Sequence, residues 1–157
     1  MSLSADFDAT DWKILRELQD NGRITNVELA SRVGLSPPPC LRRVQALEKS
    51  GVISGYRAVL NAGLLGYEIA VFASVGLRSQ AEGELKAFES LIAQWPVVRE
   101  AYAVSGEADY LLKLVSRNLP ELQSFIIDKL TAAAPVDSVK TTLILRVAKY
   151  DPGVPLR

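Results

Sequence analysis

Residues 25–50, TNVELASRVGLSPPPCLRRVQALEKS, predict two short helices joined by a glycine turn. The first helix opens with a capping-box pair, Thr25 and Glu28, in which each side chain can satisfy a backbone N–H of the other residue. Gly34 suits the tight turn between the helices, and Ser36 offers a hydroxyl cap to the second helix. Apolar residues at helical spacing predict that the first helix buries Val27, Leu29, Ala30 and Val33.

The second helix carries apolar residues at three-residue steps, which predicts a buried stripe of Leu41, Val44 and Leu47. Three prolines follow Ser36 and stiffen the helix start, which can lie as late as Pro38. A second helix of this kind binds in a DNA major groove, with its N-terminal residues at base edges and its arginines at guanine or phosphate. Paired amphipathic helices also occur in proteins that never bind DNA, so the pattern alone leaves both interpretations open.

Positive charge is concentrated in this part of the chain, although the whole chain has a formal net charge of zero. Residues 26–57 hold five basic and two acidic residues, a local balance of +3, whereas residues 61–157 hold ten basic and eleven acidic ones. Phosphate attraction should therefore act at one end of the molecule, and the modest charge suggests that two or more chains bind DNA together. The residues expected to contact DNA are Asn26, Ser36, Pro37, Pro38, Arg42, Arg43, Gln45, Lys49 and Arg57.

Two stretches of the sequence resemble a known family of regulators. The run NVELASRVGLSPPPCLRRVQALEKSGVISGY, residues 26–56, resembles the DNA-binding half of the Lrp/AsnC family, the leucine-responsive or feast/famine regulators. The run SGEADYLLKL, residues 105–114, resembles the signature turn of that family's amino-acid-sensing domain. The resemblance runs nearly end to end. It implies a transcription regulator with an N-terminal winged helix-turn-helix domain and a C-terminal ferredoxin-like domain of the RAM type that senses an amino acid.

The segments around the helix-turn-helix complete an N-terminal domain. Residues 8–21 predict a helix with Asp8 as its N-cap, and residues 52–53 and 56–60 predict short extended segments that can form a wing. This helix at residues 8–21 is expected to bury one face, which consists of Trp12, Leu15 and Leu18. We expect a DNA-binding domain over residues 1–60, a linker over 61–66, and an effector-binding and oligomerisation domain over 67–157.

Beyond the linker, the pattern changes to strands and helices in the order β-α-β-β-α-β. This order is the ferredoxin-like arrangement, a four-stranded antiparallel sheet with both helices on one face, so the chain is α+β. The last strand is expected to cover residues 136–147. Ala70, Phe72, Thr142 and Ile144 then form an apolar patch on the uncovered sheet face. Covering this patch with a second copy gives a homodimer, and the resemblance implies further assembly to tetramers or octamers.

The residue types present give little support for catalysis or metal binding. The chain has no histidine and a single cysteine, Cys40, which lies in an apolar helix and is expected to be a core residue. We therefore expect no enzyme activity, no metal and no cofactor. Apolar runs stay well short of the roughly 18 residues of a membrane span, and the N-terminus lacks the features of a signal peptide. A cytoplasmic protein without membrane contact is expected.

The turn at residues 105–110 is the candidate effector site. A free amino acid needs a carboxylate for its ammonium group, donors for its own carboxylate and an apolar pocket. Glu107 or Asp109 can supply the first, although a plain hairpin turn with Gly106 at positive φ also explains these residues. The resemblance favours an effector site, in which Asp109 either touches the ligand or only holds the turn. The expected effector residues are Tyr102, Gly106, Glu107, Asp109, Tyr110, Thr141 and Thr142.

Taken together, these patterns favour a sequence-specific DNA-binding transcription regulator whose assembly or DNA binding responds to a small effector, which by resemblance is an amino acid. Its expected partners are double-stranded DNA, the effector and further copies of the chain. Two alternatives stay open at this point. One is an architectural DNA binder with no effector, and the other is a metabolic sensor or enzyme subunit whose N-terminal helices bind protein.

Overall fold

The computed structural model describes residues 7–156 and divides the chain into two compact units. The first unit runs to Val59 and also takes in the chain from Tyr150 onward, and the second is Leu60–Lys149. The sequence placed the chain from Tyr150 in the second domain, whereas in the structure it groups with the first unit. Within the described residues, no helix combines the length and the apolar character needed to cross a membrane.

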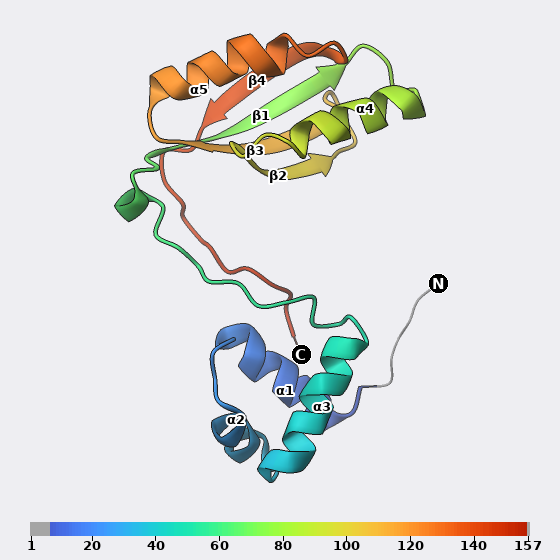
Figure 1. Cartoon of the computed structure of the whole chain (residues 1–157), viewed down its shortest axis with the longest axis vertical. Helices are drawn as coiled ribbons and strands as arrows, with labels where there is room; N and C mark the ends of the chain where they lie inside the picture. Colours follow the sequence, from blue (N-terminus) through green and yellow to red (C-terminus); the bar gives the residue numbers. More distant parts are fainter. Residues whose placement is uncertain (1–6, 157) are drawn as a thin grey trace. The chain divides into compact units, whose positions relative to one another are not determined.

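Three helices build the first unit, namely α1 (Ala9–Asp20), α2 (Asn26–Val33) and α3 (Pro37–Lys49) (Figure 1). Asp8 caps α1 as expected, because its carboxylate accepts hydrogen bonds from the backbone N–H groups of Thr10 and Asp11 at 2.8 and 2.9 Å. Thr25 caps α2 through the N–H of Glu28, at 3.2 Å. Gly34 ends α2 in the left-handed conformation, with φ of 77°, as the turn requires.

The core of the first unit is formed by all three helices. Cys40 is fully buried, which raises the pKa of its thiol and confirms it as a core residue. The chain end contributes too, because Leu156 packs against this core. The buried members are Ile14, Leu15, Leu29, Ala30, Val33, Cys40 and Leu47.

The buried stripes of these helices differ from the expected ones at three positions. In α3, the core face carries Cys40 and Leu47, whereas Leu41 is 45% exposed. Residues six apart point about 120° away from each other on a helix that turns about 100° per residue, so Leu41 and Leu47 cannot share a narrow stripe. Residues at three-residue steps move around the helix in this way, so the first residue of such a series can turn away from the core. Trp12 is 38% exposed and Val27 is 67% exposed, so both expectations of burial were wrong.

The start of α3 also corrects an expectation. Ser36 is the N-cap residue, but its side chain makes no capping hydrogen bond. An N-cap side chain accepts from the N–H of the second or third helical residue, and these are Pro38 and Pro39, which have none. The helix begins at Pro37, and its first backbone bond runs from the N–H of Cys40 to the carbonyl of Ser36, at 3.3 Å.

No hairpin follows α3 in the described chain. Residues 54–61 have neither helical nor strand structure, so the two extended segments expected there pair with no strand of this chain. Ile53 still packs partly against the core of the first unit. A wing built as a sheet is therefore not present in the described residues of a single chain.

The chain end docks on α1 through the side-chain amide of Gln19, which donates one hydrogen bond and accepts another. Gln19 Nε2 donates to the carbonyl of Val154 at 2.8 Å, and the N–H of Val154 donates back to Gln19 Oε1 at 3.1 Å. Gly153, with φ of +119°, makes this approach possible, because a Cβ there would lie 2.5 Å from Gln19 Oε1. The docking of the chain end thus depends on a glycine at this position.

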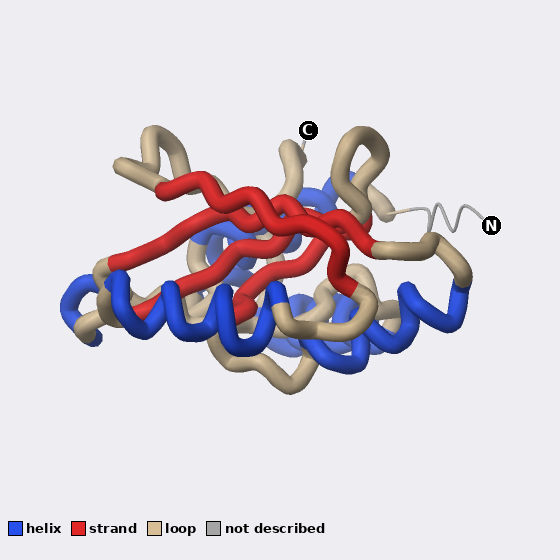
Figure 2. Tube along the Cα trace, turned by 90° about the horizontal axis from the view of Figure 1, so that it is seen from above, coloured by secondary structure: helices blue, strands red, loops and turns tan. Residues whose placement is uncertain are grey.

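The second unit is a four-stranded antiparallel sheet in the order β2-β3-β1-β4, which confirms the ferredoxin-like arrangement. The strands form one layer, and the helices lie along one of its faces (Figure 2). Its strands are β1 (Ile69–Leu77), β2 (Val98–Ala103), β3 (Tyr110–Ser116) and β4 (Val136–Leu143). Its helical elements are a short turn, η1 (Gly63–Leu65), then α4 (Glu82–Ile92) and α5 (Leu119–Phe125), which continues as the π-helix η2 (Ile126–Thr131).

The last strand is shorter than expected and ends at Leu143 instead of residue 147. Its partner β1 begins at Ile69, so pairing ends with the hydrogen bond from the N–H of Ile144 to the carbonyl of Ala70, at 2.9 Å. Beyond that point no neighbouring strand is left to bond. The apolar residues of this segment are correspondingly exposed, Leu145 to 89% and Val147 to 67%.

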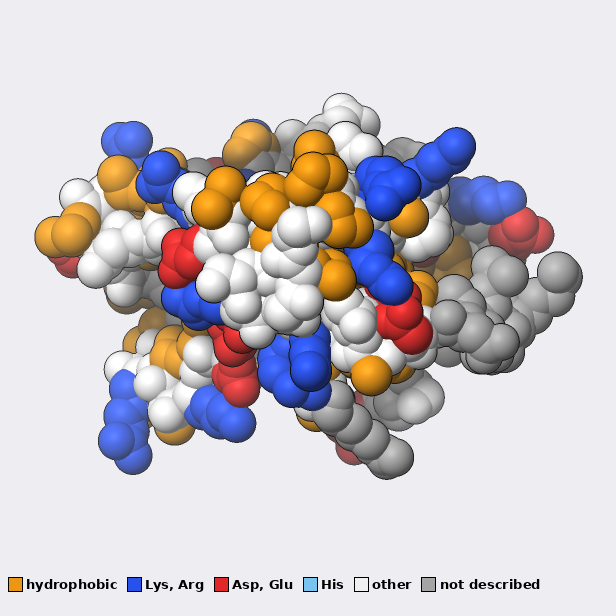
Figure 3. Space-filling model, turned by 90° about the horizontal axis from the view of Figure 1, so that it is seen from below, with side chains coloured by type: hydrophobic (Ala, Val, Ile, Leu, Met, Phe, Trp, Pro, Cys, Tyr) orange, Lys and Arg blue, Asp and Glu red, His pale blue; other side chains and the backbone are white. Residues whose placement is uncertain are grey.

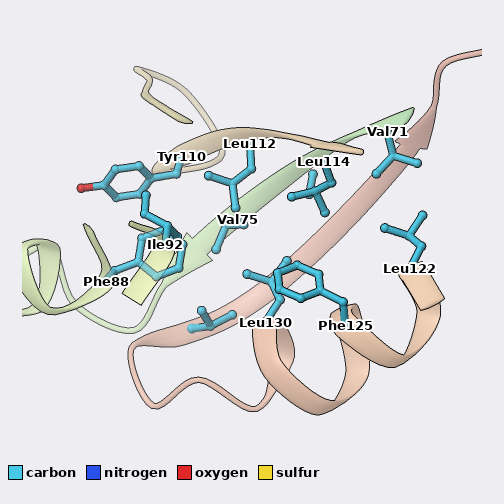
Figure 4. Packing of buried hydrophobic residues seen from close by; sticks show 12 residues of the cluster. Val71, Val75, Phe88, Ile92, Tyr110, Leu112, Leu114, Leu122, Phe125 and Leu130 are labelled. Atoms are coloured by element: carbon cyan, nitrogen blue, oxygen red, sulfur yellow. The ribbon is translucent and has the colours of Figure 1, made fainter. Parts of the chain in front are cut away.

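The core of the second unit lies between the sheet and its helices. Figure 4 shows side chains from β1 and β3 directed toward those of α4, α5 and η2. Where α4 packs against β3, the rings of Phe88 and Tyr110 are in contact, with centroids 5.0 Å apart. Leu112, Leu114 and Leu130 are fully buried. Alternate residues of β3 are therefore committed to the core, and those between them face the opposite side of the sheet.

We predict that Gly153→Ala releases the chain end from α1, because the added Cβ is strained at this φ and collides with Gln19. Hydrogen exchange in α1, followed by peptide-resolved mass spectrometry, should become faster. Gly83→Ala is the control, since Gly83 lies in α4 with open space around its Cβ position. It should leave α1 unchanged and stabilise α4 by about 0.5–1 kcal/mol. Equal exchange in α1 for Gly153→Ala and wild type would contradict the docking.

Candidate nucleic-acid interface and effector turn

The side of α3 that faces away from the core forms a continuous exposed strip. Its residues are spaced i, i+3, i+4, i+7 and i+11, which places them on one side of a helix. We call this strip the outer face; it consists of Pro38, Leu41, Arg42, Gln45 and Lys49, all of them exposed. It carries two cations, amide and apolar groups and no carboxylate. Such a surface suits an anionic partner that also offers hydrogen-bonding and apolar groups.

Arg43 does not lie on the outer face. Its Nη1 atom lies 2.8 Å from Asp8 Oδ2 and 2.8 Å from Asp11 Oδ1. These carboxylates raise the pKa of Arg43, with the hydrogen bond to Asp11 as the largest cause. The pKa of Asp8 lies below its ordinary value, chiefly because the N–H of Asp11 donates to it and further because of Arg43. Arg43 therefore fastens α3 to the capped start of α1.

The other residues expected at DNA lie around the start of α3 or outside the helices. Asn26 Nδ2 donates to the carbonyl of Pro37 at 2.8 Å, which ties the start of α2 to the start of α3. Its Oδ1 atom is buried and has no hydrogen-bond partner among residues 7–156. Ser36 and Pro37 are exposed beside this contact, and Arg57 is exposed in the irregular segment after α3. Figure 3 shows one face of the molecule, on which Lys and Arg side chains lie among hydrophobic ones.

In the second unit, Asp109 joins three strand ends. Its Oδ2 atom accepts from the N–H of Leu77 at 2.7 Å, and its Oδ1 atom accepts from Gln80 Nε2 at 2.8 Å. Its own N–H donates to the carbonyl of Val75, and its carbonyl accepts from the N–H of Val104, both at 3.0 Å. Every polar group of Asp109 is thus engaged within the chain, so the residue has the geometry of a turn holder.

The remaining turn residues have different environments. Gly106 has φ of +134°, a conformation that favours glycine. Glu107 is the exposed acid of the turn, with 96% of its side chain accessible and only a 3.9 Å contact to Lys140. Tyr110 is buried in the core, where its hydroxyl donates to Glu89 Oε1 at 2.8 Å; burial is the main cause that raises its pKa to about 12.

The strand residues expected at the effector site fall on opposite faces of the sheet. Thr141 pairs with Ala73, which is fully buried on the helix side, whereas Thr142 pairs with Phe72 on the open face. Tyr102 of β2 also lies on the open face, 51% exposed. Tyr102 and Thr142 therefore share the open face but lie on the two opposite edge strands, β2 and β4, and Thr141 lies on the other face. A single chain thus does not bring these three side chains together.

The open face also carries a polar cluster that the sequence did not predict. Lys113 Nζ lies 2.7 Å from Glu100 Oε1, and the hydroxyl of Tyr102 donates to Glu100 Oε2 at 2.7 Å. The hydrogen bond from Lys113 is the largest cause that holds the pKa of Glu100 below its ordinary value. Residues 100 and 113 are register partners in β2 and β3, a pairing that follows once the turn length is known.

We predict that the first unit loses stability as the pH falls below about 4, the ordinary pKa of an aspartate. The pKa of Asp8 is lower in the folded chain, so its stabilising effect is present above the unfolded value and is lost as pH falls through the folded value. Melting curves followed by circular dichroism between pH 6 and pH 3 measure this loss. Asp8→Asn, which keeps an N-cap acceptor but cannot ionise, should show a shallower decline than wild type. Parallel declines would contradict the assignment.

Both units match known protein families. A family model described as "Winged helix-turn-helix DNA-binding" matches residues 7–54. A second, described as "Lrp/AsnC ligand binding domain", matches residues 70–154. The first match spans the three helices with the outer face of α3, and the second spans the sheet, its helices and the 105–110 turn.

Related proteins are similar over nearly the whole chain. The "Leucine-responsive regulatory protein" of Rhizobium meliloti (strain 1021) is 58% identical over 149 residues, which cover 95% of this chain and 96% of that protein. The protein of the same name from Escherichia coli (strain K12) is 38% identical over 144 residues, 92% of this chain and 88% of that protein. A transcriptional regulator from Neisseria meningitidis, solved as a complex with L-Met, has a TM-score of 0.92 and 37% identity, covering 96% of this chain and 97% of that chain.

Proposed function

The chain belongs to the Lrp/AsnC family and is a DNA-binding transcription regulator that responds to a small effector, and on that premise we propose that α3 reads DNA and that the 105–110 turn takes part in sensing an amino acid. The observation that carries the first part is the outer face of α3. It exposes Arg42, Gln45 and Lys49 on the side opposite the core. The proposed division of the chain is a DNA-binding domain over residues 1–60, a linker over 61–66 and an effector and assembly domain over 67–149, after which the chain from Tyr150 returns to the first unit.

The residues near α3 have separate roles in this proposal. Arg42 and Gln45 face base edges, because arginine pairs with guanine and glutamine with adenine in the major groove. Lys49 and Arg57 bind phosphates, and Ser36 offers its hydroxyl, which makes no capping bond. Arg43 acts indirectly, through the ion pairs that set the orientation of α3. In a dimer, two copies of α3 address half-sites about 34 Å apart or a multiple of that distance.

The effector proposal gives the two acids of the turn different roles. Asp109 holds the turn, since both of its carboxylate oxygens already accept hydrogen bonds. Glu107 pairs with the ammonium group of the amino acid, which its exposure allows. An apolar side chain on the ligand is supported by the names of the leucine-responsive relatives and by the L-Met complex of the Neisseria regulator.

The open face of the sheet supports a homodimer. Phe72 is 37% exposed and Tyr102 51% exposed on this face, and no helix among the described residues of the second unit covers it. A second copy placed against the same face buries these rings in a self-complementary interface. Further assembly to tetramers or octamers follows from the family resemblance. A regulator of this kind acts in the cytoplasm, where it reaches chromosomal DNA, and its proposed mechanism requires no catalytic step and no cofactor.

We predict that Arg42→Ala weakens DNA binding while leaving thermal stability unchanged, and that Arg43→Ala lowers thermal stability. Arg42 should account for roughly 1–3 kcal/mol of binding free energy if it contacts a base. Arg43→Ala leaves Asp8 and Asp11 without their cation. Binding is measured by fluorescence anisotropy on a duplex selected from random-sequence DNA by the wild-type protein, with Arg99→Ala in β2 as the control. Unchanged affinity in both variants would place the reading surface elsewhere, and salt-insensitive binding would favour a protein-binding role.

We predict that L-Leu or L-Met raises the melting temperature of the wild-type protein, since a ligand at 100 times its dissociation constant adds about 2.7 kcal/mol to the folded state. Glu107→Gln should abolish the shift without changing the melting temperature of the free protein, whereas Asp109→Ala should lower that temperature itself. Glu68→Gln, an exposed acid outside the turn, is the control. No shift with any of the twenty amino acids would favour an architectural DNA binder.

A further inference from the structure

We infer that Leu41, together with Pro38, reads the methyl groups of thymines in the major groove, and so adds apolar sequence readout to the polar contacts of α3. This assignment rests on the proposed function, because it requires α3 to lie in the groove. The side chains of Leu41 and Pro38 can neither donate nor accept a hydrogen bond, so the polar contacts proposed for α3 do not involve them. The assignment also explains why an apolar side chain occupies the outer face.

The position of Leu41 supports the inference. Leu41 is 45% exposed, and it lies between Pro38 and Gln45 on the outer face. Residues three and four apart on a helix are neighbours on its surface, so Leu41 lies beside Pro38 and beside Gln45. The core of the first unit is complete without it, since Cys40 and Leu47 fill the inner side of α3.

The three prolines remove the polar alternative at this end of α3. A helix N-terminus normally binds phosphate through its free N–H groups. Here the first three helical residues are Pro37, Pro38 and Pro39, so the first turn offers no such donor. Apart from the Ser36 hydroxyl at the N-cap, the N-terminal end of α3 therefore presents pyrrolidine rings and the Leu41 side chain. In a helix-turn-helix, this is the end that lies closest to base edges.

The C5-methyl of thymine is the one alkyl group on the major-groove edge of unmodified DNA. Hydrogen-bonding atoms of the other base edges would lose water against Leu41 without gaining a partner, which is unfavourable. A thymine methyl instead removes apolar surface from water on both sides of the contact. The same residues thus attract thymine and disfavour cytosine or guanine at the positions they reach.

The test replaces thymine by uracil, which removes the methyl group and keeps every hydrogen-bonding atom of the base. A duplex is first selected from random-sequence DNA by the wild-type protein, and each thymine in the selected site is then replaced singly by deoxyuridine. Wild-type affinity should fall about fourfold for each contacted methyl, as expected for burying one methyl-sized group. Replacement at thymines in the flanking DNA should have no effect and controls for changes in the duplex.

The variant Leu41→Ala identifies the side chain responsible. It should bind the thymine duplex more weakly than wild type and bind the thymine and uracil duplexes equally well at the sensitive position. Leu64→Ala makes the same chemical change at a residue of η1 that is 85% exposed, and it should keep the wild-type difference between the two duplexes. Circular dichroism melts of both variants establish that they are folded.

Each other outcome overturns the inference. If no thymine in the selected site is sensitive to uracil, α3 reads no methyl group, although DNA binding itself and the proposed function stand. If Leu41→Ala keeps the full difference between thymine and uracil, another side chain makes the contact. If the wild type enriches no sequence at all, the proposed sequence-specific function fails, and the assignment of Leu41 fails with it.

Discussion

The rotational setting of α3 decides what the first unit can present to a partner. Burial of Cys40 and Leu47 against α1 and α2 fixes which side of the helix faces solvent. The guanidinium of Arg43 forms ion pairs with Asp8 and Asp11 at the start of α1. Because the core side and these ion pairs are set, the residues at the opposite side of the helix form one exposed strip. The proposed DNA contacts and the apolar readout both follow from that setting.

A single carboxylate has a comparable role in the second unit. Asp109 accepts the N–H of Leu77 at the end of β1 and the amide of Gln80 just before α4, at 2.7 and 2.8 Å. Its backbone bonds link the ends of β1 and β2. The turn between β2 and β3 is thereby held to a strand that is its neighbour in space but not in sequence. An effector bound near Glu107, as proposed, would therefore act on a turn that Asp109 holds to β1.

The two units share more than one chain connection. The chain leaves the first unit after Val59 and returns to it at Tyr150, where Gln19 and Gly153 secure the end of the chain on α1. Residues 144–149 follow β4 directly and lead to this docked segment.

The sequence by itself determined the kind and order of the three helices of the first unit and of the strands and main helices of the second. Asp8 and Thr25 cap helices through bonds to neighbours two or three residues away, and the β-α-β-β-α-β order follows from local periodicity. The expected hydroxyl cap at Ser36 was wrong, because the prolines that follow it have no N–H to donate. Tertiary structure alone decided the rest. Arg43 meets Asp8 and Asp11 across 35 and 32 residues, and β4 ends where β1 begins, since ion pairs and strand ends depend on partners that no local pattern specifies.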